Sequence, residues 1–305
     1  MITNKQKIIP HLWFDKEAEK AAGFYTSIFP ESEITSITKI RNTPSGDTNS
    51  VSFKIRGHSF VAISAGPLFK LNPSISFFVN FDPLKDRHAR ERIDMVWNEL
   101  IKGGKALMSL DKYSFSERYG WVQDRYGVSW QLILTDPESE ERPFVIPSFL
   151  FAGELCGKAE EATNFYISIF KDSKRGEIVR YPAGMTPDKE GTVMFTDFEL
   201  LGQWFAAMDS AKQHGFSFNE AVSLMVLCDT QEEIDFYWEK LSAVPEAEQC
   251  GWLKDKYNVS WQIVPSSFED MMANGTREQM DRVTEAFLKM KKFEIVKLQK
   301  AYEGD

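Results

Sequence analysis

GWVQDRYGVSW at residues 120–130 returns almost letter for letter as GWLKDKYNVSW at residues 251–261. Between the apolar ends of each stretch lies a short polar segment, DRYG in the first and DKYN in the second. An Asp that opens a turn accepts hydrogen bonds from the backbone that follows it, and Gly and Asn are the residues that tolerate a left-handed backbone. The motif therefore predicts a hairpin turn in each copy, with a positive φ at Gly127 and at Asn258.

This hairpin is part of a longer repeat that keeps its order along the chain. The other repeated segments are IPHLWF (9–14) with IPSFLF (146–151), FYTSIF (24–29) with FYISIF (165–170), and ISFFVNFD (75–82) with VSLMVLCD (222–229). A preserved order with variable spacing indicates a tandem duplication followed by loop insertions and deletions. We therefore predict a first domain over residues 1–140 and a second over residues 145–266, joined by the acidic linker TDPESEERP.

Within each copy, helical and extended periodicities alternate. Ala18, Ala22 and Tyr25 lie at helical spacing, whereas the segment VSFKI (51–55) alternates as a strand does. The pattern predicts an α+β fold in which each copy is a pair of βαβββ units. Residues 267–305 lie outside the duplication, and their apolar side chains recur at helical spacing, which predicts a C-terminal helical tail.

The bulk composition narrows the range of partners. The chain carries 45 acidic and 36 basic residues and a net charge of -9, which argues against a surface for nucleic acid. The first residues lack the apolar core of a signal peptide, and no stretch reaches the ~20 apolar residues of a membrane span. Three cysteines fit neither a disulfide framework nor a CxxC zinc site. We therefore expect a cytoplasmic protein that binds neither nucleic acid nor membranes; its oligomeric state stays open.

The two copies resemble the vicinal-oxygen-chelate superfamily of glyoxalases, bleomycin-resistance proteins and dioxygenases. Within it the chain looks most like the PhnB-like branch labelled 3-demethylubiquinone-9 3-methyltransferase. The matching segments are LWFDKEAEKAAGFYTSIFPES, GHSFVAISAGP, GWVQDRYGVSWQLI, GWLKDKYNVSWQIVP and AFLKMKKFEIVKLQKAYEG. The resemblance implies sheets that curl around a cavity, with helices on the outer face.

The resemblance also implies where a metal would bind, because metal-using members of the superfamily take one ligand from each of four strands. The corresponding positions are Ile9, Ala62, Ser76 and Gln131 in the first copy, and Ile146, Ala207, Ser223 and Gln262 in the second. A divalent cation needs three or four good donors, and neither set supplies them. A slip of two residues on the first strand would bring in His11, whose counterpart is Ser148. We expect no metal and no cofactor.

The same comparison places Gln131 inside a cavity, opposite Ser76. The candidate ligand-binding residues are His11, Trp13, Ser76, Phe78, Gln131, Ser223 and Gln262. Apolar walls with a few convergent polar groups suit a small ligand. Alternatively, these side chains only fill the interior of a barrel, with Gln131 bonded to Ser76. No catalytic residue can be assigned from the sequence.

Two functions follow as expectations. The first is binding of a small molecule in a sheet-lined cavity without metal. The alternative is a metal-dependent lyase, isomerase or dioxygenase that acts on a small oxygen-rich metabolite. No glycine-rich strand-to-helix turn indicates a nucleotide-type cofactor, so the methyltransferase label has no support from a motif. Whether a reaction is catalysed, whether both cavities function and which ligand binds stay open.

Overall fold

Both copies of the repeated hairpin adopt the predicted turn in the computed structural model, which describes residues 6–305. The backbone φ is 94° at Gly127 and 62° at Asn258, so both residues are left-handed as predicted. The two positions differ in the space around them, because a Cβ atom at Gly127 would approach Leu71 Cβ to 3.1 Å. Packing as well as backbone conformation therefore favours glycine in the first copy.

The aspartate that opens each turn is the buried centre of the motif. Asp124 Oδ1 accepts hydrogen bonds from the backbone N–H groups of Tyr126 and Val128, at 2.8 and 3.1 Å. Its Oδ2 accepts one from the indole N–H of Trp130 at 2.9 Å. Asp255 makes the same three bonds in the second copy, at 2.8, 3.0 and 2.9 Å. The carboxylate thus fixes both the turn and the side-chain directions of the strand that follows.

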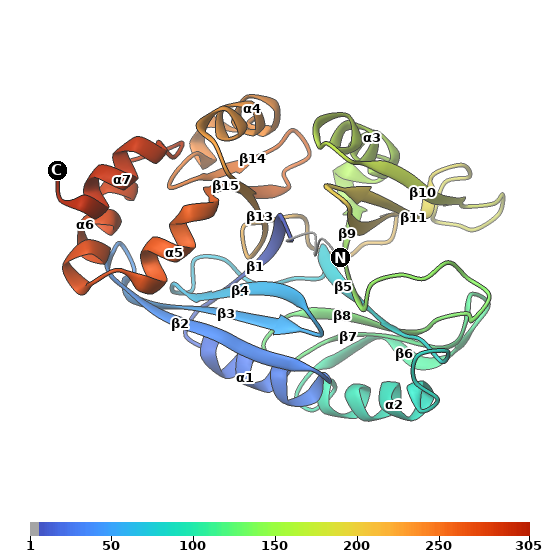
Figure 1. Cartoon of the computed structure of the whole chain (residues 1–305). Helices are drawn as coiled ribbons and strands as arrows, with labels where there is room; N and C mark the ends of the chain where they lie inside the picture. The colour runs from blue at the N-terminus through green and yellow to red at the C-terminus, as the bar shows by residue number, and fades with distance from the viewer. Residues whose placement is uncertain (1–5) are drawn as a thin grey trace. The chain divides into compact units, whose positions relative to one another are not determined.

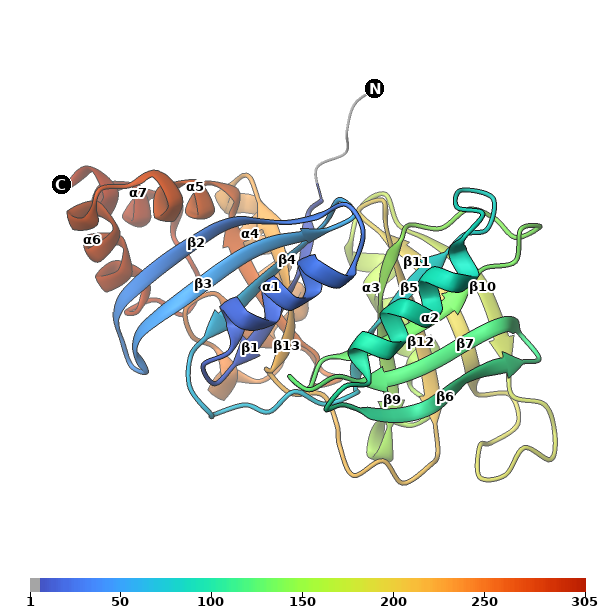
Figure 2. The ribbon, with the colours of Figure 1, turned by 90° about the horizontal axis from the view of Figure 1, so that it is seen from below.

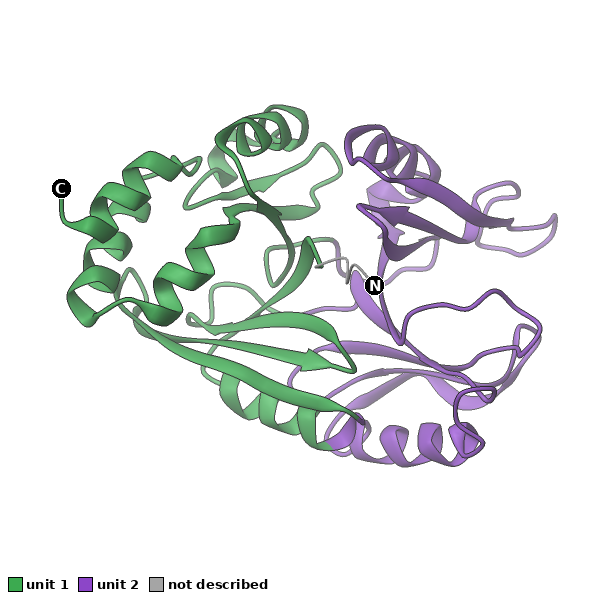
Figure 3. Ribbon diagram, viewed as in Figure 1, with its two compact units in different colours: residues 1–27, 31–70, 218–305 green, residues 28–30, 71–217 purple. Residues whose placement is uncertain are grey.

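The described chain forms two compact units, each built on one sheet (Figure 3). Unit 1 comprises the N-terminal segment to residue 27 with residues 31–70 and 218–305, and unit 2 comprises residues 28–30 and 71–217. Each unit thus takes half of each sequence repeat, so the units cut across the domains 1–140 and 145–266 expected from the duplication. The reason is strand pairing: the first strand of one half-repeat pairs antiparallel with the first strand of a half-repeat from the other copy.

In unit 1, seven strands lie in the order β14-β15-β13-β1-β4-β3-β2. Helix α1 lies against the outer face near β2–β4, and α4 packs on β13–β15 (Figures 1 and 2). Three further helices form the predicted C-terminal tail. The bounds are β1 Ile8–Phe14, α1 Ala18–Ile28, β2 Ser32–Thr43, β3 Gly46–Ile55, β4 His58–Ser64, β13 Val222–Cys228, α4 Gln231–Leu241, β14 Trp252–Lys254, β15 Ser260–Pro265, α5 Ser266–Asn274, α6 Arg277–Phe287 and α7 Ile295–Glu303.

In unit 2, eight strands lie in the order β10-β11-β12-β9-β5-β8-β7-β6. Helix α2 packs on β7 and β8, and α3 packs on β11 and β12. The bounds are β5 Ile75–Phe81, α2 Ala89–Leu100, β6 Lys105–Tyr113, β7 Ser116–Gln123, β8 Ser129–Leu134, β9 Val145–Ala152, α3 Ala159–Ile169, β10 Lys174–Arg180, β11 Val193–Leu200 and β12 Gln203–Ser210. The α+β architecture is confirmed. None of the helices found in residues 6–305 has the length and apolar character that a membrane crossing requires.

Three of the four expected βαβββ units are complete, and the fourth is short by one strand. After α4 the chain forms a 3-10 turn at Pro245–Ala247 and then only β14 and β15. Cys250 and Gly251 have φ values of 53° and 83°, and the flanking Gln249 and Trp252 exchange backbone hydrogen bonds. This two-residue hairpin reverses the chain where the other units carry a long strand. The expected pairing of βαβββ units is therefore confirmed, with one strand of the fourth unit reduced to this hairpin.

The helices α1 and α3 bury the faces that the periodicity predicted. Ala18 and Tyr25 of α1 have no exposed surface, and neither do Ala159 and Tyr166 of α3. Small alanines let each helix approach its sheet closely, while the tyrosine ring fills the core beneath it. The residues that repeat at helical spacing are thus those that pack against the sheet.

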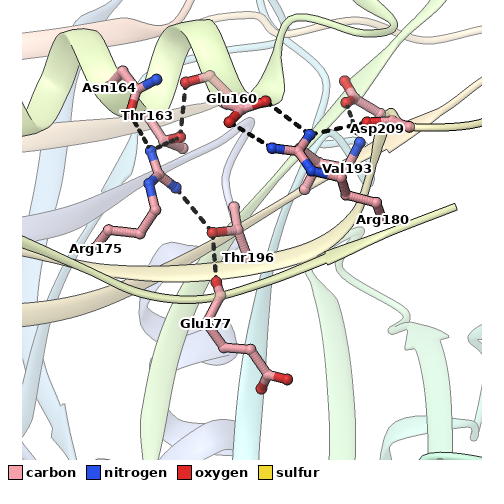
Figure 4. A network of polar contacts seen from close by, with 10 residues as sticks. Glu160, Thr163, Asn164, Arg175, Glu177, Arg180, Val193, Thr196 and Asp209 are labelled. Carbon is pink, nitrogen blue, oxygen red and sulfur yellow. Dashed lines mark hydrogen bonds and ion pairs between the residues drawn. The ribbon is translucent and has the colours of Figure 1, made fainter.

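Helix α3 is also tied to its sheet by a polar network (Figure 4). The Arg175 guanidinium donates to the hydroxyls of Thr163 and Thr196, at 2.8 and 2.9 Å, which links the helix to β11. Arg180 of β10 donates to both carboxylate oxygens of Glu160, at 2.7 and 2.8 Å. The bidentate pair is half-exposed, so we assign it a role in orienting the helix rather than a large share of stability.

The buried aspartate yields a test of the hairpin. In Asp124→Asn, one carboxylate oxygen becomes an NH2 group, which would face an N–H donor instead of accepting its hydrogen bond. We expect the free energy of unfolding to fall by about 1–3 kcal/mol. Asp136 provides the control, because it also accepts a backbone hydrogen bond in a turn but is exposed. Asp136→Asn should change stability by less than about 0.5 kcal/mol. Denaturant unfolding measures both, and equal effects would contradict a special role for the buried carboxylate.

Candidate ligand-binding site

Unit 1 contains a cavity of about 180 Å³, here named the inner cavity. Its walls come from β1, β4, β13 and β15, and its cover comes from the C-terminal helices α5 and α6. A second space of about 370 Å³, the adjoining cavity, lies beside the β2–β3 hairpin. The two share the wall residues Trp13, Ile40, Ile63, Cys250, Trp252 and Phe287. The two cavities of unit 1 therefore adjoin and share part of one wall.

The polar floor of the inner cavity is formed by Gln262 on β15 and His11 on β1. Gln262 Nε2 donates a hydrogen bond to Ser223 Oγ of β13 at 2.9 Å. Ser223 in turn lies opposite His11 in the antiparallel register of β1 and β13. The amide oxygen of Gln262 has no hydrogen bond within residues 6–305 and belongs to a cavity-lining side chain, so it can accept one from a ligand.

Among the described residues that line the inner cavity, His11 is the one histidine. Its side chain is 6% exposed, and its Nδ1 atom is buried without a hydrogen-bond partner. Burial lowers the pKa of His11 to about 4, because the charged form would lose its hydration. The imidazole is therefore neutral at physiological pH and can exchange hydrogen bonds, but it does not supply a positive charge.

Aromatic rings form the remaining walls. Trp252 meets His11 edge to face at a centroid distance of 5.4 Å, and Trp13 meets Phe69 in the same way at 5.1 Å. The indole of Trp13 donates to Gly66 O at 2.7 Å, which fixes its ring in the wall. Trp13 and Trp252 lie 6.2 Å apart between centroids, so both cavities border on the same pair of indoles.

The C-terminal tail covers this cavity through three phenylalanines. Phe268 of α5 lies 5.4 Å from Phe287 of α6 and 5.4 Å from Phe293, measured between ring centroids. The backbone N–H groups of Cys250 and Gly251 donate to the carbonyls of residues 290 and 291, at 2.8 and 2.7 Å. The tail is thus anchored at the hairpin that replaces the missing strand, and it closes the space which that strand would have filled.

Unit 2 has the same order of strands with one further edge strand, and its central glutamine is bonded within the protein. Tyr119 donates to Gln131 Oε1 at 2.5 Å, and Gln131 Nε2 donates to Ser76 Oγ at 2.8 Å. Both ends of this amide are therefore bonded within the protein. Phe78 and Tyr119 belong to an apolar cluster with Ile146, and further aromatic side chains pack against it. In unit 2, Gln131 is thus bonded to Ser76 and lies beside an apolar cluster.

The repeated tryptophan of the opening motif also behaves differently in the two units. In unit 2, Trp121 Nε1 donates to Ser129 Oγ at 2.7 Å. In unit 1 the corresponding Ser260 Oγ is buried without a partner, and Trp252 lines the cavity instead. The same two residue types therefore make a structural bond in one unit and leave an indole facing the cavity in the other.

The predicted site residues separate between the units. His11, Trp13 and Gln262 line the inner cavity, and Ser223 contacts it through Gln262. Ser76, Phe78 and Gln131 lie together in the packed interior of unit 2. The sequence analysis missed Trp252 and the tail residues Phe268 and Phe287 as wall residues. Trp252 could have been noticed because it recurs at the same place in both copies of the motif. The helical spacing of the tail predicted an apolar helix face, but not the surface against which that face packs.

The expected metal positions need a correction on one strand. Val61 and Ile63 of β4 line the inner cavity, whereas Ala62 is fully buried on the opposite face of the sheet. In the same way Ala206, and not Ala207, belongs to the interior cluster of unit 2. The assignment was off by one residue, and because side chains alternate along a strand, this reverses the face.

The corrected donor set in unit 1 does not fit a divalent cation. The strands contribute an imidazole from His11, the apolar Val61 or Ile63 and the amide of Gln262, whose partner Ser223 is neutral. Within the described residues, no group of three His, Cys, Asp or Glu side chains lies close enough together to hold a metal ion. A zinc, nickel or iron site would need at least two more strong donors.

Comparisons with known proteins agree with the duplicated fold. The family model described as 3-demethylubiquinone-9 3-methyltransferase matches twice, over residues 6–133 and 144–264. The PhnB protein from Bacillus cereus is 38% identical over a match that covers 43% of this chain and 100% of that chain, with a TM-score of 0.38. Glyoxalase I from Zea mays is 9% identical, and the match covers 85% of this chain and 94% of that chain at a TM-score of 0.50. The second likeness concerns the fold alone. No protein of curated function matches the chain.

The bond from Tyr119 to Gln131 predicts a stability effect in unit 2. In Tyr119→Phe the buried amide oxygen of Gln131 loses its donor, so we expect the free energy of unfolding to fall by about 1–3 kcal/mol. Tyr113→Phe is the control, because the Tyr113 hydroxyl donates to Ser109 O in an exposed part of the same unit. Thermal and denaturant unfolding should show little change in the control. A Tyr119→Phe protein as stable as the wild type would show that the amide does not need this donor.

The lowered pKa of His11 predicts a dependence of stability on pH. The unfolded chain binds a proton near pH 6.5, whereas the folded chain does not until about pH 4, so stability is complete above pH 6.5 and falls as the pH drops towards 4. His58 has a similarly lowered pKa and adds to the same slope. We therefore expect His11→Asn to lose less stability than the wild type between pH 7 and pH 4.5, by about 1–3 kcal/mol. An unchanged slope would mean that His11 titrates alike in both states.

Proposed function

Because the chain belongs to the 3-demethylubiquinone-9 3-methyltransferase family, with the fold of the vicinal-oxygen-chelate superfamily, we propose that it binds a small molecule in the inner cavity of unit 1. Unit 2 serves as a packed structural counterpart, so one molecule binds per chain. The cavity is lined mostly by apolar and aromatic side chains, with a few polar groups that converge on its floor. This composition is typical of small-molecule sites.

The observation that carries the proposal is the difference between two equivalent glutamines. Gln131 is bonded at both ends of its amide, to Tyr119 and Ser76. Gln262 keeps the bond to Ser223, but at the position aligned with Tyr119 the second copy has Cys250, which lines the cavity. The amide oxygen of Gln262 therefore faces the cavity with no partner among the described residues, and it can accept a hydrogen bond. A ligand group that donates to Gln262 Oε1 would supply the missing bond.

His11 adds a second reason to assign the site to unit 1. The Nδ1 atom of His11 is buried and unpartnered, as is the Oγ atom of the aligned Ser148 in unit 2, but only His11 lines the inner cavity. A ligand hydroxyl, amide or ring nitrogen placed between His11 and Gln262 could bond to both side chains. Such a pair of neutral groups can orient a ligand, but it cannot polarise one as a Lewis acid would.

We infer that binding proceeds without metal, since the donor set falls short of what a divalent cation requires. We also regard the methyl transfer in the family description as a name and not as a reaction of this chain, because no motif for a nucleotide-type cofactor supports it. A metal-dependent enzyme acting on an oxygen-rich metabolite is the alternative. Stoichiometric zinc, nickel or iron that is lost on replacing His11 would favour that alternative.

We further infer a cytoplasmic location for the protein. The three cysteines, Cys156, Cys228 and Cys250, are all free thiols. Burial raises the pKa of Cys250 to about 11, so this thiol in the cavity wall is protonated and a weak nucleophile. Reduced cysteines are what a reducing compartment maintains.

The duplication provides the test of this proposal and its control. The neutral aromatic alcohol 1-naphthalenemethanol, titrated by calorimetry and by tryptophan fluorescence, should bind with a stoichiometry of one per chain. Gln262→Met should weaken binding by roughly three- to tenfold, the loss of one hydrogen bond. Gln131→Met, the same change in unit 2, should leave the affinity unaltered, with folding of both variants checked by thermal unfolding. Two sites per chain, or an equal effect of both variants, would contradict the assignment to unit 1.

A further inference from the structure

The charge of the cavity walls bears on the chemistry of the ligand. Of the described residues that line the inner and adjoining cavities, three are acidic, namely Glu220, Glu246 and Glu269, and none is Lys or Arg. His11 does not alter this balance, because its pKa is lowered by burial and the ring is neutral near pH 7. The described walls of the two cavities therefore present acidic side chains and no lysine or arginine to a ligand.

The three carboxylates are not equally neutralised. Glu220 is largely compensated by Lys254, at 2.8 Å, and both side chains are mostly buried. Glu269 of α5 accepts a hydrogen bond from Ser52 Oγ at 3.1 Å, which leaves its charge intact. Neither Glu246 nor Glu269 forms an ion pair with a residue in the described part of the chain. Two uncompensated negative charges thus lie at the rims of the cavities, one at each.

Aromatic faces lie between these two charges. Trp13 and Trp252 border both cavities, and the inner one is covered by the rings of Phe268 and Phe287. A flat ring can stack against such walls, and the negative faces of the indoles also attract a cation. An anion would meet both the ring faces and the carboxylates unfavourably. The shape of the walls favours a flat ring, and their charge favours a cation.

We propose that the ligand is an aromatic cation, a flat ring system with an amine or another positively charged group, stacked against the wall that Trp13 and Trp252 form, with its charge towards Glu246 or Glu269. This proposal rests on the function proposed above and specifies the chemistry of the same site. It excludes phosphate, phosphonate and carboxylate compounds as good ligands. Gln262 and His11 hydrogen-bond whatever polar group the ring carries on its buried side.

Three probes with one ring system test the charge preference. They are the cation 1-naphthylmethylammonium, the neutral 1-naphthalenemethanol and the anion 1-naphthoate, each titrated into the full chain at pH 7.5. We expect the cation to bind roughly three- to tenfold more tightly than the alcohol, and the anion to bind more weakly than the alcohol. Raising the salt concentration from 0.05 to 0.5 M should narrow the gap between cation and alcohol, because the rim carboxylates are exposed to solvent.

The variant Glu246→Gln/Glu269→Gln assigns the preference to its residues. It should bring the affinity for the cation close to that for the alcohol and leave the alcohol unaffected. Glu138→Gln, an exposed substitution in unit 2, is the matched control and should change nothing. Equal affinities for all three probes, or tightest binding of the anion, would overturn the charge preference while leaving small-molecule binding intact. If none of the three probes binds, the proposed function falls and the ligand class falls with it.

Discussion

A buried carboxylate holds the closing hairpin of each unit in place. Asp124 and Asp255 each bond two backbone N–H groups of the turn and the indole of the tryptophan two residues into the next strand. Fixing that indole towards the helix side forces the following glutamine, Gln131 or Gln262, onto the opposite face, because side chains alternate along a strand. The interior of each sheet therefore receives its central polar group from a constraint set several residues away.

What surrounds that glutamine differs between the units, and the difference arises from the strand before it. In unit 2, β7 is long enough to bring Tyr119 into the interior, where its hydroxyl bonds Gln131. In unit 1 the left-handed Cys250 and Gly251 end the hairpin early, so the corresponding space stays open and the C-terminal helices cover it. A duplicated fold has thus produced one packed interior and one cavity from the same arrangement of strands.

Much of the fold and part of the site could be predicted, because they depend on local patterns. The turn residues and the helix faces around Tyr25 and Tyr166 follow from periodicity and repeated motifs, whereas the position of Gln131 opposite Ser76 was implied by the family resemblance. The face of Ala62 could not be settled in this way, because a one-residue error in a strand reverses the side. The repeated motif drew attention to Trp252, but its role in the wall depends on the fold, since the equivalent Trp121 is bonded to Ser129.

By itself, the sequence determined the duplication, the α+β class, the hairpin chemistry and the residues that could reach an interior, because each is encoded within a few neighbouring positions. The tertiary structure alone decided which halves of the two repeats form a unit, since strands more than two hundred residues apart, β1 and β13, pair only in the folded chain. It also decided that His11 and Gln262 face a cavity while Gln131 is enclosed. Burial and partner choice are properties of the assembled interior, where hydrogen bonds are made between segments distant in the chain.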